Sequence, residues 1–246
     1  NTKDDPFVAG GGDWTGRLRF ARADLGPVVL VDGTGDLVMK DGTATLTELT
    51  ATVNDGRVRV SGDFSLDSGP LRWRGALAAD NVRVTEGLGR PLSFIVPILR
   101  TKLGDSRRHL TGVLDAKLEF RGIGTTYATL AQSLSGGGSI GFRDVELQGS
   151  LLLPLLSLRI DQLLTDRSYR FSDLNIQFGV KDGRVRARPF ELRGEPFGIK
   201  LEGEAGLDGS LDFLVQPALL PVPLRVKGTL DKPKVRPDPL AGLPFR

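Results

Sequence analysis

The strongest constraint on the fold is an alternation of apolar and polar side chains with a period of two residues. In NDGRVRVSGDFSL, residues 54–66, the residues Val58, Val60, Phe64 and Leu66 share one parity, and most positions between them are charged or hydroxylated. Successive side chains of a β-strand point to opposite faces, so this segment has one apolar and one polar face. The pattern predicts half-buried strands of an antiparallel sheet.

The same alternation recurs along most of the chain. We expect strands within residues 16–25, 27–40, 42–54, 56–66, 71–84, 110–124, 138–149, 169–181, 184–194, 197–207, 210–217 and 222–230. Asp-Gly pairs at residues 32–33, 41–42 and 55–56 are typical of two-residue hairpin turns, so successive strands should form an antiparallel meander. A slip of the apolar phase near Arg143 and Asp144 predicts a β-bulge, and the phase changes again at Arg188-Pro189.

Three segments interrupt the strand pattern with helix-like spacing. We expect one or two short helices around residues 85–103, a helix near 125–134 that begins at Thr125 or Thr126 and ends at Gly136, and an apolar helix over 151–164. The predicted organisation is therefore a lead-in over 1–13, a β-meander over 14–84, a helical insertion over 85–109, a second β region over 110–239 and a tail over 240–246.

Composition narrows the class of function. The 246 residues include 33 basic and 30 acidic side chains mixed along the chain, which gives a net charge of +3 and does not indicate a nucleic-acid partner. There is no cysteine, which excludes disulfides and thiolate chemistry, and no apolar run long enough for a membrane-spanning helix. Because the chain begins at Asn1, we expect a mature form, a fragment or an excised domain, with any membrane anchor upstream.

Residues for catalysis are nearly absent. His109 is the only histidine and lies in a polar turn, so no multi-histidine metal centre or histidine relay is available. The glycine triplet 136–138 does not match a phosphate-binding loop, and we interpret it as a helix end followed by a strand. We expect a protein that is not an enzyme and that uses no cofactor or metal.

A series of motifs in the second half of the chain is similar to a known family. In order, they are LTGVLDAKLEFRGIGTTYATLAQSLSGGGSIGFRDVELQG, FSDLNIQFGVKDGRVRARPFELRG, GIKLEGEAGLDGSLDFLVQP and PLRVKGTLDKPKVRPDP, together covering roughly residues 110–239. Their order, and the closing VKGTLDKPKVRPD, resemble the C-terminal region of AsmA-like proteins, the TamB relatives of the bacterial envelope. Residues 14–84 have compatible strands but no matching motif.

The resemblance implies a long curved antiparallel sheet, shaped like a taco shell, with two or three short helices. It also implies a periplasmic protein, anchored in the inner membrane in its full-length form, that transports phospholipids along an apolar groove and contributes to outer-membrane biogenesis. The groove would be lined by residues of the apolar strand faces. The candidates are Val58, Val60, Phe64, Leu118, Phe120, Ile176, Phe178, Ile199, Leu201, Phe213 and Val226.

Two interpretations of the apolar faces remain open at this point. In the first, they hold phospholipid or another acyl lipid and the protein is membrane-associated. In the second, they bury one another in a structural β-domain that binds envelope proteins at its sheet edges. A lipid carrier should have an accessible apolar surface, whereas a self-buried core should not.

Overall fold

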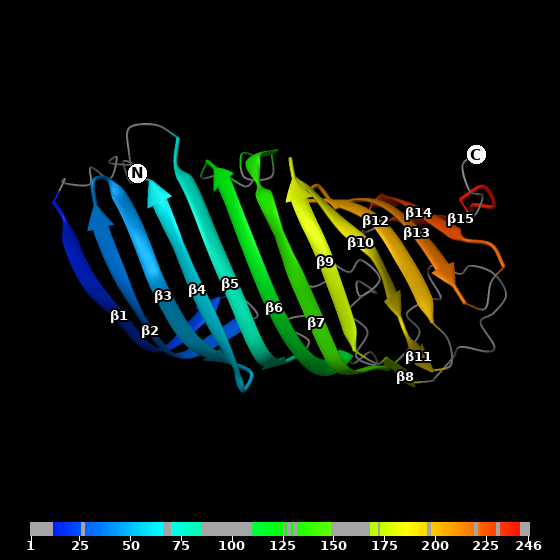
Figure 1. The fold of residues 1–246 in the computed structure, drawn as a ribbon, viewed down its shortest axis with the longest axis horizontal. Coiled ribbons are helices and arrows are strands. Elements are labelled where there is room, and N and C mark those ends of the chain that lie inside the picture. The colour runs from blue at the N-terminus through cyan, green and yellow to red at the C-terminus, as the bar shows by residue number, and fades with distance from the viewer. Residues whose placement is uncertain are drawn as a thin grey trace, which may run out of the picture.

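The chain forms one open antiparallel sheet, as the two-residue alternation predicts (Figure 1). The computed structural model describes residues 12–25, 28–65, 70–84, 110–124, 126, 129, 132–148, 168–171, 173–195, 198–218, 221–229 and 232–241. Most of these residues are in strands. The prediction of a mainly β fold with a long curved antiparallel sheet is confirmed.

Fifteen strands make up the sheet. Their bounds are β1 Trp14–Leu25, β2 Val28–Lys40, β3 Thr43–Val53, β4 Gly56–Ser65, β5 Arg72–Arg83, β6 Leu110–Ile123, β7 Ser135–Gln148, β8 Ser168–Phe171, β9 Leu174–Lys181, β10 Arg184–Leu192, β11 Gly194–Glu195, β12 Ile199–Gly206, β13 Ser210–Pro217, β14 Leu224–Thr229 and β15 Pro233–Pro237.

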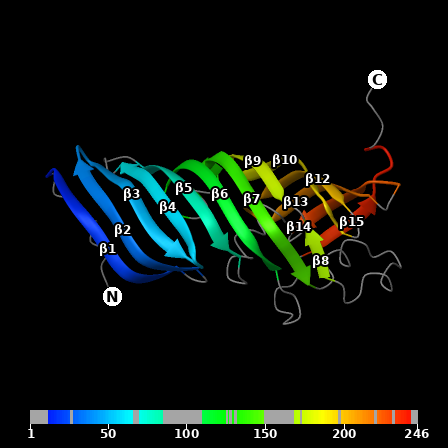
Figure 2. The same cartoon turned by 60° about the horizontal axis from the view of Figure 1, so that its bottom comes forward.

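The strand order follows the sequence from one end of the molecule to the other. Thirteen strands form the continuous path β1-β2-β3-β4-β5-β6-β7-β9-β10-β12-β13-β14-β15. Of the two short strands outside this path, β8 pairs with β7 and β11 pairs with β8. Figures 1 and 2 show the resulting sheet as long, twisted and curved, with β1 and β15 at opposite ends. Because β5 pairs directly with β6, the two predicted β regions, 14–84 and 110–239, belong to one sheet.

Tight two-residue turns connect several neighbouring strands. Asp41-Gly42 joins β2 to β3 and Asp182-Gly183 joins β9 to β10, with positive φ at all four residues. The predicted turn at Asp55-Gly56 is wrong by one residue. The turn consists of Asn54-Asp55, and Gly56 already belongs to β4, where it pairs with Val53. These turns suit hairpins because positive φ at both central residues matches the twist of the strands.

The predicted turn at Asp32-Gly33 is wrong, because β2 runs through this pair without reversing. Asp32 has a φ of 53°, but Gly33 does not have the positive φ that a two-residue turn needs. A register shift between Val31 and Thr34 marks an irregularity in the pairing with β3. The Phe20 ring lies where a Cβ on Gly33 would be, 2.0 Å from its Cζ, so close packing between β1 and β2 occupies this site.

The predicted bulge near Arg143 and Asp144 is confirmed and has a partner in β5. Asp144 has a φ of 52°, Asn81 has a φ of 56°, and the register shifts at both sites. Asp115 on β6 connects the two bulges, since its carboxylate accepts hydrogen bonds from the Asn81 backbone N–H at 2.8 Å and from Arg143 Nη2 at 2.9 Å. The phase change at Arg188-Pro189 is likewise a register shift, between Ala187 and Phe190.

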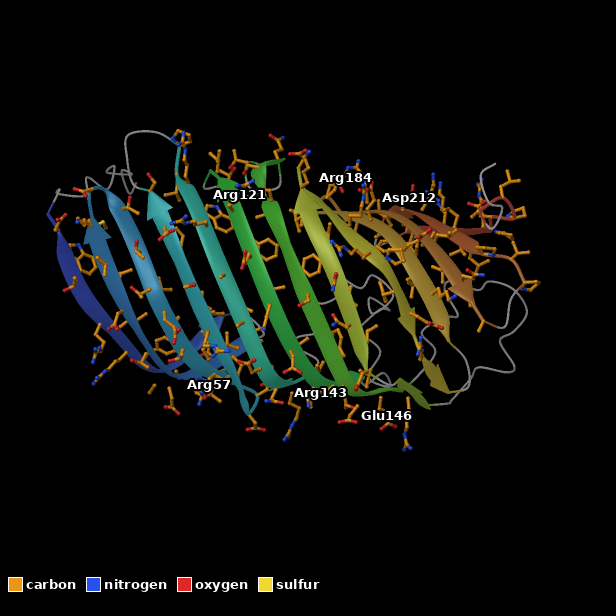
Figure 3. All side chains as sticks on the ribbon, in the orientation of Figure 1. Arg57, Arg121, Arg143, Glu146, Arg184 and Asp212 are labelled. Carbon is orange, nitrogen blue, oxygen red and sulfur yellow. The ribbon has the colours of Figure 1, made fainter. Side chains whose placement is uncertain are left out.

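Cross-strand ion pairs cover the polar face of the sheet. They include Arg17–Asp36, Arg59–Asp80, Arg74–Asp63, Arg184–Glu204 and Arg225–Asp212. Figure 3 shows that Arg57, Arg143 and Glu146 lie near one end of the strands, with Arg121 and Arg184 near the other. Opposite charges on paired strands favour the observed register by a few tenths of a kcal/mol to about 1 kcal/mol each.

The expected helices lie largely outside the described residues. Residues 85–109 and 151–164 are not among them, and nothing tests those two predictions. Near the third, Thr129, Gln132 and Ser133 are helical, and Thr126 Oγ1 accepts a hydrogen bond from the Thr129 N–H at 3.3 Å. The prediction that Gly136 ends this helix is wrong, because residues 136–138 lie inside β7 and pair with both β6 and β9.

Candidate functional site: a continuous apolar sheet face

One face of the sheet carries an uninterrupted line of non-polar residues across all thirteen strands of the path. Each member is the direct register partner of the next, which brings them together although they are spread over most of the chain. This central apolar row consists of Leu18, Gly35, Leu49, Val60, Leu77, Leu118, Gly138, Phe178, Ala187, Gly203, Phe213, Val226 and Val235. Twelve strand spacings correspond to an arc of about 58 Å.

A second line on the same face runs parallel to the first and contains many glycines. This glycine-rich row consists of Gly16, Leu37, Leu46, Gly62, Gly75, Phe120, Gly136, Val180, Val185, Ala205, Leu211, Gly228 and Pro233. The two rows lie two residues apart on most strands, so they form an apolar band. Neither row includes a side chain that can ionise or form a hydrogen bond.

Solvent exposure along the band changes from one end of the sheet to the other. In the central apolar row, Leu18 on β1 is 45% exposed, whereas Phe178 on β9 is 6% exposed and Phe213 on β13 is 4% exposed. Leu49, Val60, Leu77 and Leu118, on the strands between, are half-buried. At the other end of the sheet, Val235 on β15 is half-buried and Pro233 is exposed. The larger accessible part of the band therefore lies over β1–β6, and a smaller one lies at β15.

The buried residues form one contiguous cluster. It extends over the apolar face from Val53 on β3 to Val226 on β14, and half-buried residues such as Leu77, Leu118 and Phe120 pack against it. Among the described elements, extensive contacts occur only between strands that are neighbours in the sheet. Within the described ranges, therefore, no second sheet packs across the accessible part of the band.

All eleven residues predicted to line a groove lie on this face, in two classes of exposure. Val58, Val60, Leu118 and Phe120 are half-buried, and Phe64 is 41% exposed. The other six are buried: Ile176, Phe178, Ile199, Leu201, Phe213 and Val226. The five accessible residues come from β4 and β6, and the six buried residues come from β9 and the strands that follow it.

Sequence reasoning missed several accessible members of the band. Leu18 lies between Arg17 and Arg19 and alternates in the same way as the eleven candidates, so the alternation was sufficient to find it. Leu77 lies between Ala76 and Ala78, and only its pairing with Val60 and Leu118 places it in the band. Leu49 was harder to recognise. The register shifts between Leu46 and Leu49, which places two residues that are three apart on the same face.

Metal-ligating side chains do not cluster among the described residues. No group of three His, Asp or Glu side chains within them could hold a metal ion. The described part of the chain also contains no helix that could span a bilayer.

Comparisons with protein-family models, with curated proteins and with solved structures gave no match to this chain.

Proposed function

We propose that this chain is a non-enzymatic lipid-binding domain, of AsmA-like type, whose apolar sheet face holds the acyl chains of phospholipids during transport in the bacterial envelope. The observation that carries the proposal is the central apolar row, which crosses thirteen strands without a polar side chain. An acyl chain that leaves water for such a surface gains about 0.8 kcal/mol per buried CH₂.

The uniformity of the band supports movement as well as binding. Its accessible residues over β3–β6 are mainly aliphatic, for example Leu49, Val60, Leu77 and Leu118, so successive positions offer an acyl chain similar packing. A surface without a deep local minimum lets a bound chain move by small steps, because each new position stabilises the chain about as well as the previous one. Lipid headgroups would remain in water.

The proposed location of the protein is the periplasm, with a membrane anchor supplied by the full-length protein.

The buried part of the apolar face favours a second candidate function. Residues from β9 to β14 such as Phe213 and Val226 are almost inaccessible, as in the core of a structural domain. The protein would then act through its sheet edges, because β1 is the edge strand of the described sheet and its outer backbone groups could pair with another envelope protein. This alternative predicts no lipid on the apolar face.

Native mass spectrometry of protein purified from bacterial cells, with lipid extraction of the same sample, tests the proposal. Phospholipid at a defined ratio is the expected result. A lipid-free mass that stays unchanged after incubation with phospholipid vesicles would contradict the proposal and favour the structural domain.

A pair of double variants separates lipid binding from folding. Val60 and Leu77 are direct partners on the apolar face, and Ser61 and Ala76 are direct partners one position along on the polar face. We expect Val60→Asp with Leu77→Asp to reduce lipid occupancy at least tenfold. Ser61→Asp with Ala76→Asp adds the same charges to the same strands and should leave occupancy within twofold. Urea unfolding of both proteins measures the effect on the fold. A loss of stability in the first variant large enough to account for the loss of lipid would favour the structural domain.

A further inference from the structure

A large hollow lies over the middle of the sheet, and most of the residues around it point to the polar face. Seven residues of the two apolar rows, among them Leu118 and Phe178, also border it. Its volume is about 1580 Å³, and the residues around it come from β3 to β12. The small residues at polar-face positions in the middle of the sheet form its floor: Ser61, Ala76, Ala78, Gly137, Ser139 and Gly179. The proposed lipid function uses none of these residues.

The glycine at position 179 has no packing reason to be a glycine. A Cβ at Gly137 would lie 2.5 Å from the Phe178 carbonyl oxygen, so close strand packing requires a glycine there. A Cβ at Gly179 would meet nothing closer than 3.9 Å, and Gly179 does not have a positive φ. Glycine within a strand is unfavourable by roughly 0.5–1 kcal/mol relative to alanine. The absence of a side chain at Gly179 keeps the hollow open.

The side chains around the hollow carry an excess of positive charge. Six are basic (Arg59, Lys117, Lys181, Arg184, Arg186 and Arg188) and four are acidic (Glu48, Glu119, Asp182 and Glu204), which gives a net charge of +2.

Several of these basic groups are available to a ligand. The single carboxylate of Glu204 accepts hydrogen bonds from two of them, from Arg184 Nη1 at 2.7 Å and from Arg186 Nη2 at 2.9 Å. Hydrogen bonds from Arg186 and then Arg184 hold the pKa of Glu204 below its ordinary value. Among the described residues, Lys117 and Lys181 form no ion pair.

Hydrogen-bonding groups accompany the cations. Lys117, Ser139 and Gln177 are register partners on β6, β7 and β9, and Gln177 Oε1 accepts from Arg188 Nη1 of β10 at 2.9 Å. From Lys117 to Arg188 the line spans three strand spacings, about 14 Å. One phosphate group is too small to reach both ends of this line. Several linked phosphates match its length and charge, because Arg, Lys and hydroxyl groups are the usual partners of phosphate oxygens.

We propose that this hollow on the polar face binds a linear anion that carries several phosphate groups, in contact with Lys117, Lys181 and Arg188. The three basic side chains named here point to the polar face, whereas the proposed acyl-chain contacts are on the apolar face of the same strands.

Isothermal titration calorimetry with inorganic tripolyphosphate tests the proposal. We expect tripolyphosphate to bind the whole chain at one site, more tightly than monophosphate by at least tenfold, with an affinity that falls as salt rises. Citrate, which carries three carboxylates on a shorter frame, should bind more weakly than tripolyphosphate. Equal affinities for monophosphate, citrate and tripolyphosphate would overturn the proposal, as would the absence of tripolyphosphate binding.

Two pairs of variants control for charge and for folding. Lys117→Gln with Lys181→Gln should weaken tripolyphosphate binding at least tenfold. Lys227→Gln with Lys234→Gln removes the same charge from two register partners of β14 and β15 outside the hollow and should change the affinity less than twofold. Equal weakening by both pairs would mean attraction to the general positive charge and would overturn the proposed site.

A filling variant tests the hollow without changing charge. Gly179→Leu should weaken tripolyphosphate binding, whereas Gly141→Leu, on the same face but outside the hollow, should not. A Cβ at Gly141 has a nearest neighbour at 3.8 Å, similar to the 3.9 Å at Gly179, so neither backbone position excludes a side chain. Full tripolyphosphate affinity in a folded Gly179→Leu protein would overturn the site, and circular dichroism confirms the fold. Lipid occupancy of these variants is a separate measurement, so either proposal can fail alone.

Discussion

The aromatic rings of Phe120 and Phe178 contact each other across a strand that lies between them, with their centroids 6.5 Å apart and their planes inclined at 33°. Phe120 is on β6 and Phe178 is on β9, and both pair with β7. The β7 residues opposite them are Gly136 and Gly138, which place no side chain between the rings. The contact joins the accessible part of the apolar band to its buried part.

We predict that Gly138→Ala destabilises the protein by about 2 kcal/mol. A Cβ at Gly138 would lie 2.1 Å from the Lys117 carbonyl oxygen, so the strands must separate to admit it, and forced overpacking costs about 1–3 kcal/mol. Gly141→Ala on the same strand is the control, since its Cβ would have no neighbour closer than 3.8 Å. Urea unfolding measures the free energy of unfolding of the two variants. Equal stability of the two variants would contradict the close approach of β6 and β7.

Asp115→Asn should destabilise the protein by roughly 1 kcal/mol. The substitution removes the charge that Arg143 contacts and weakens the hydrogen bond from the Asn81 backbone, so the bulges in β5 and β7 lose their common partner. The value is modest because the Asp115 side chain is 40% exposed. Asp24→Asn disrupts an exposed ion pair within β1 and should leave the unfolding midpoint unchanged. Comparable losses in the two variants would argue against a role for Asp115 at the bulges.

Stability should decrease as the solution is acidified. Hydrogen bonds from the Asn81 backbone and from Arg143 lower the pKa of Asp115, and a hydrogen bond from Arg225 lowers the pKa of Asp212. A carboxylate with a lowered folded-state pKa contributes stability that is fully present above its unfolded pKa and is lost as pH falls through the folded pKa. The ordinary value for both residues is 3.8, so the loss begins near pH 5 and continues below pH 4. Urea midpoints that stay constant between pH 7 and pH 3 would refute this prediction. Asp115→Asn should reduce the slope.

Gly183→Ala should destabilise the turn between β9 and β10. Gly183 has a φ of 71°, and a residue with a Cβ pays about 1–2 kcal/mol in this left-handed region. Asp182 also has a positive φ, of 50°, but Asp182→Asn should be nearly neutral because asparagine tolerates that conformation. Thermal or urea unfolding distinguishes the two variants by their midpoints. An unchanged midpoint for Gly183→Ala would show that the turn adopts another conformation in solution.

Hydrogen exchange should be fastest at the β1 edge of the sheet and slow at β9. Among the described strands, β1 pairs only with β2, so alternate amides of residues 14–25 have no partner there, whereas β9 pairs with β7 and β10. Mass spectrometry of deuterium uptake resolves peptides that cover residues 14–25 and 174–180. Slow exchange throughout residues 14–25 would mean that another strand pairs with this edge in solution, as the alternative function expects.

The sequence predicted the fold class and the apolar face well, because both depend on local periodicity. The eleven groove candidates lie on one face since residues of equal parity within a strand share a face. Dipeptides were less informative. Asp41-Gly42 forms a hairpin turn, but Asp32-Gly33 lies within β2, although the Asp has a positive φ in both. The two pairs differ in the φ of the glycine, which is positive at Gly42 but not at Gly33, where the Phe20 ring packs.

The sequence by itself therefore determined that this protein has an antiparallel sheet with one apolar and one polar face. The tertiary structure decided how those faces are used. It aligned thirteen separate positions into the central apolar row, left Leu18 exposed and Phe213 buried, and gathered Lys117, Lys181 and Arg188 around a hollow on the other face. Alternation fixes the direction of each side chain but contains no information about which strands are neighbours or what covers a position. Accessible surface and clusters of charge arise only from that arrangement.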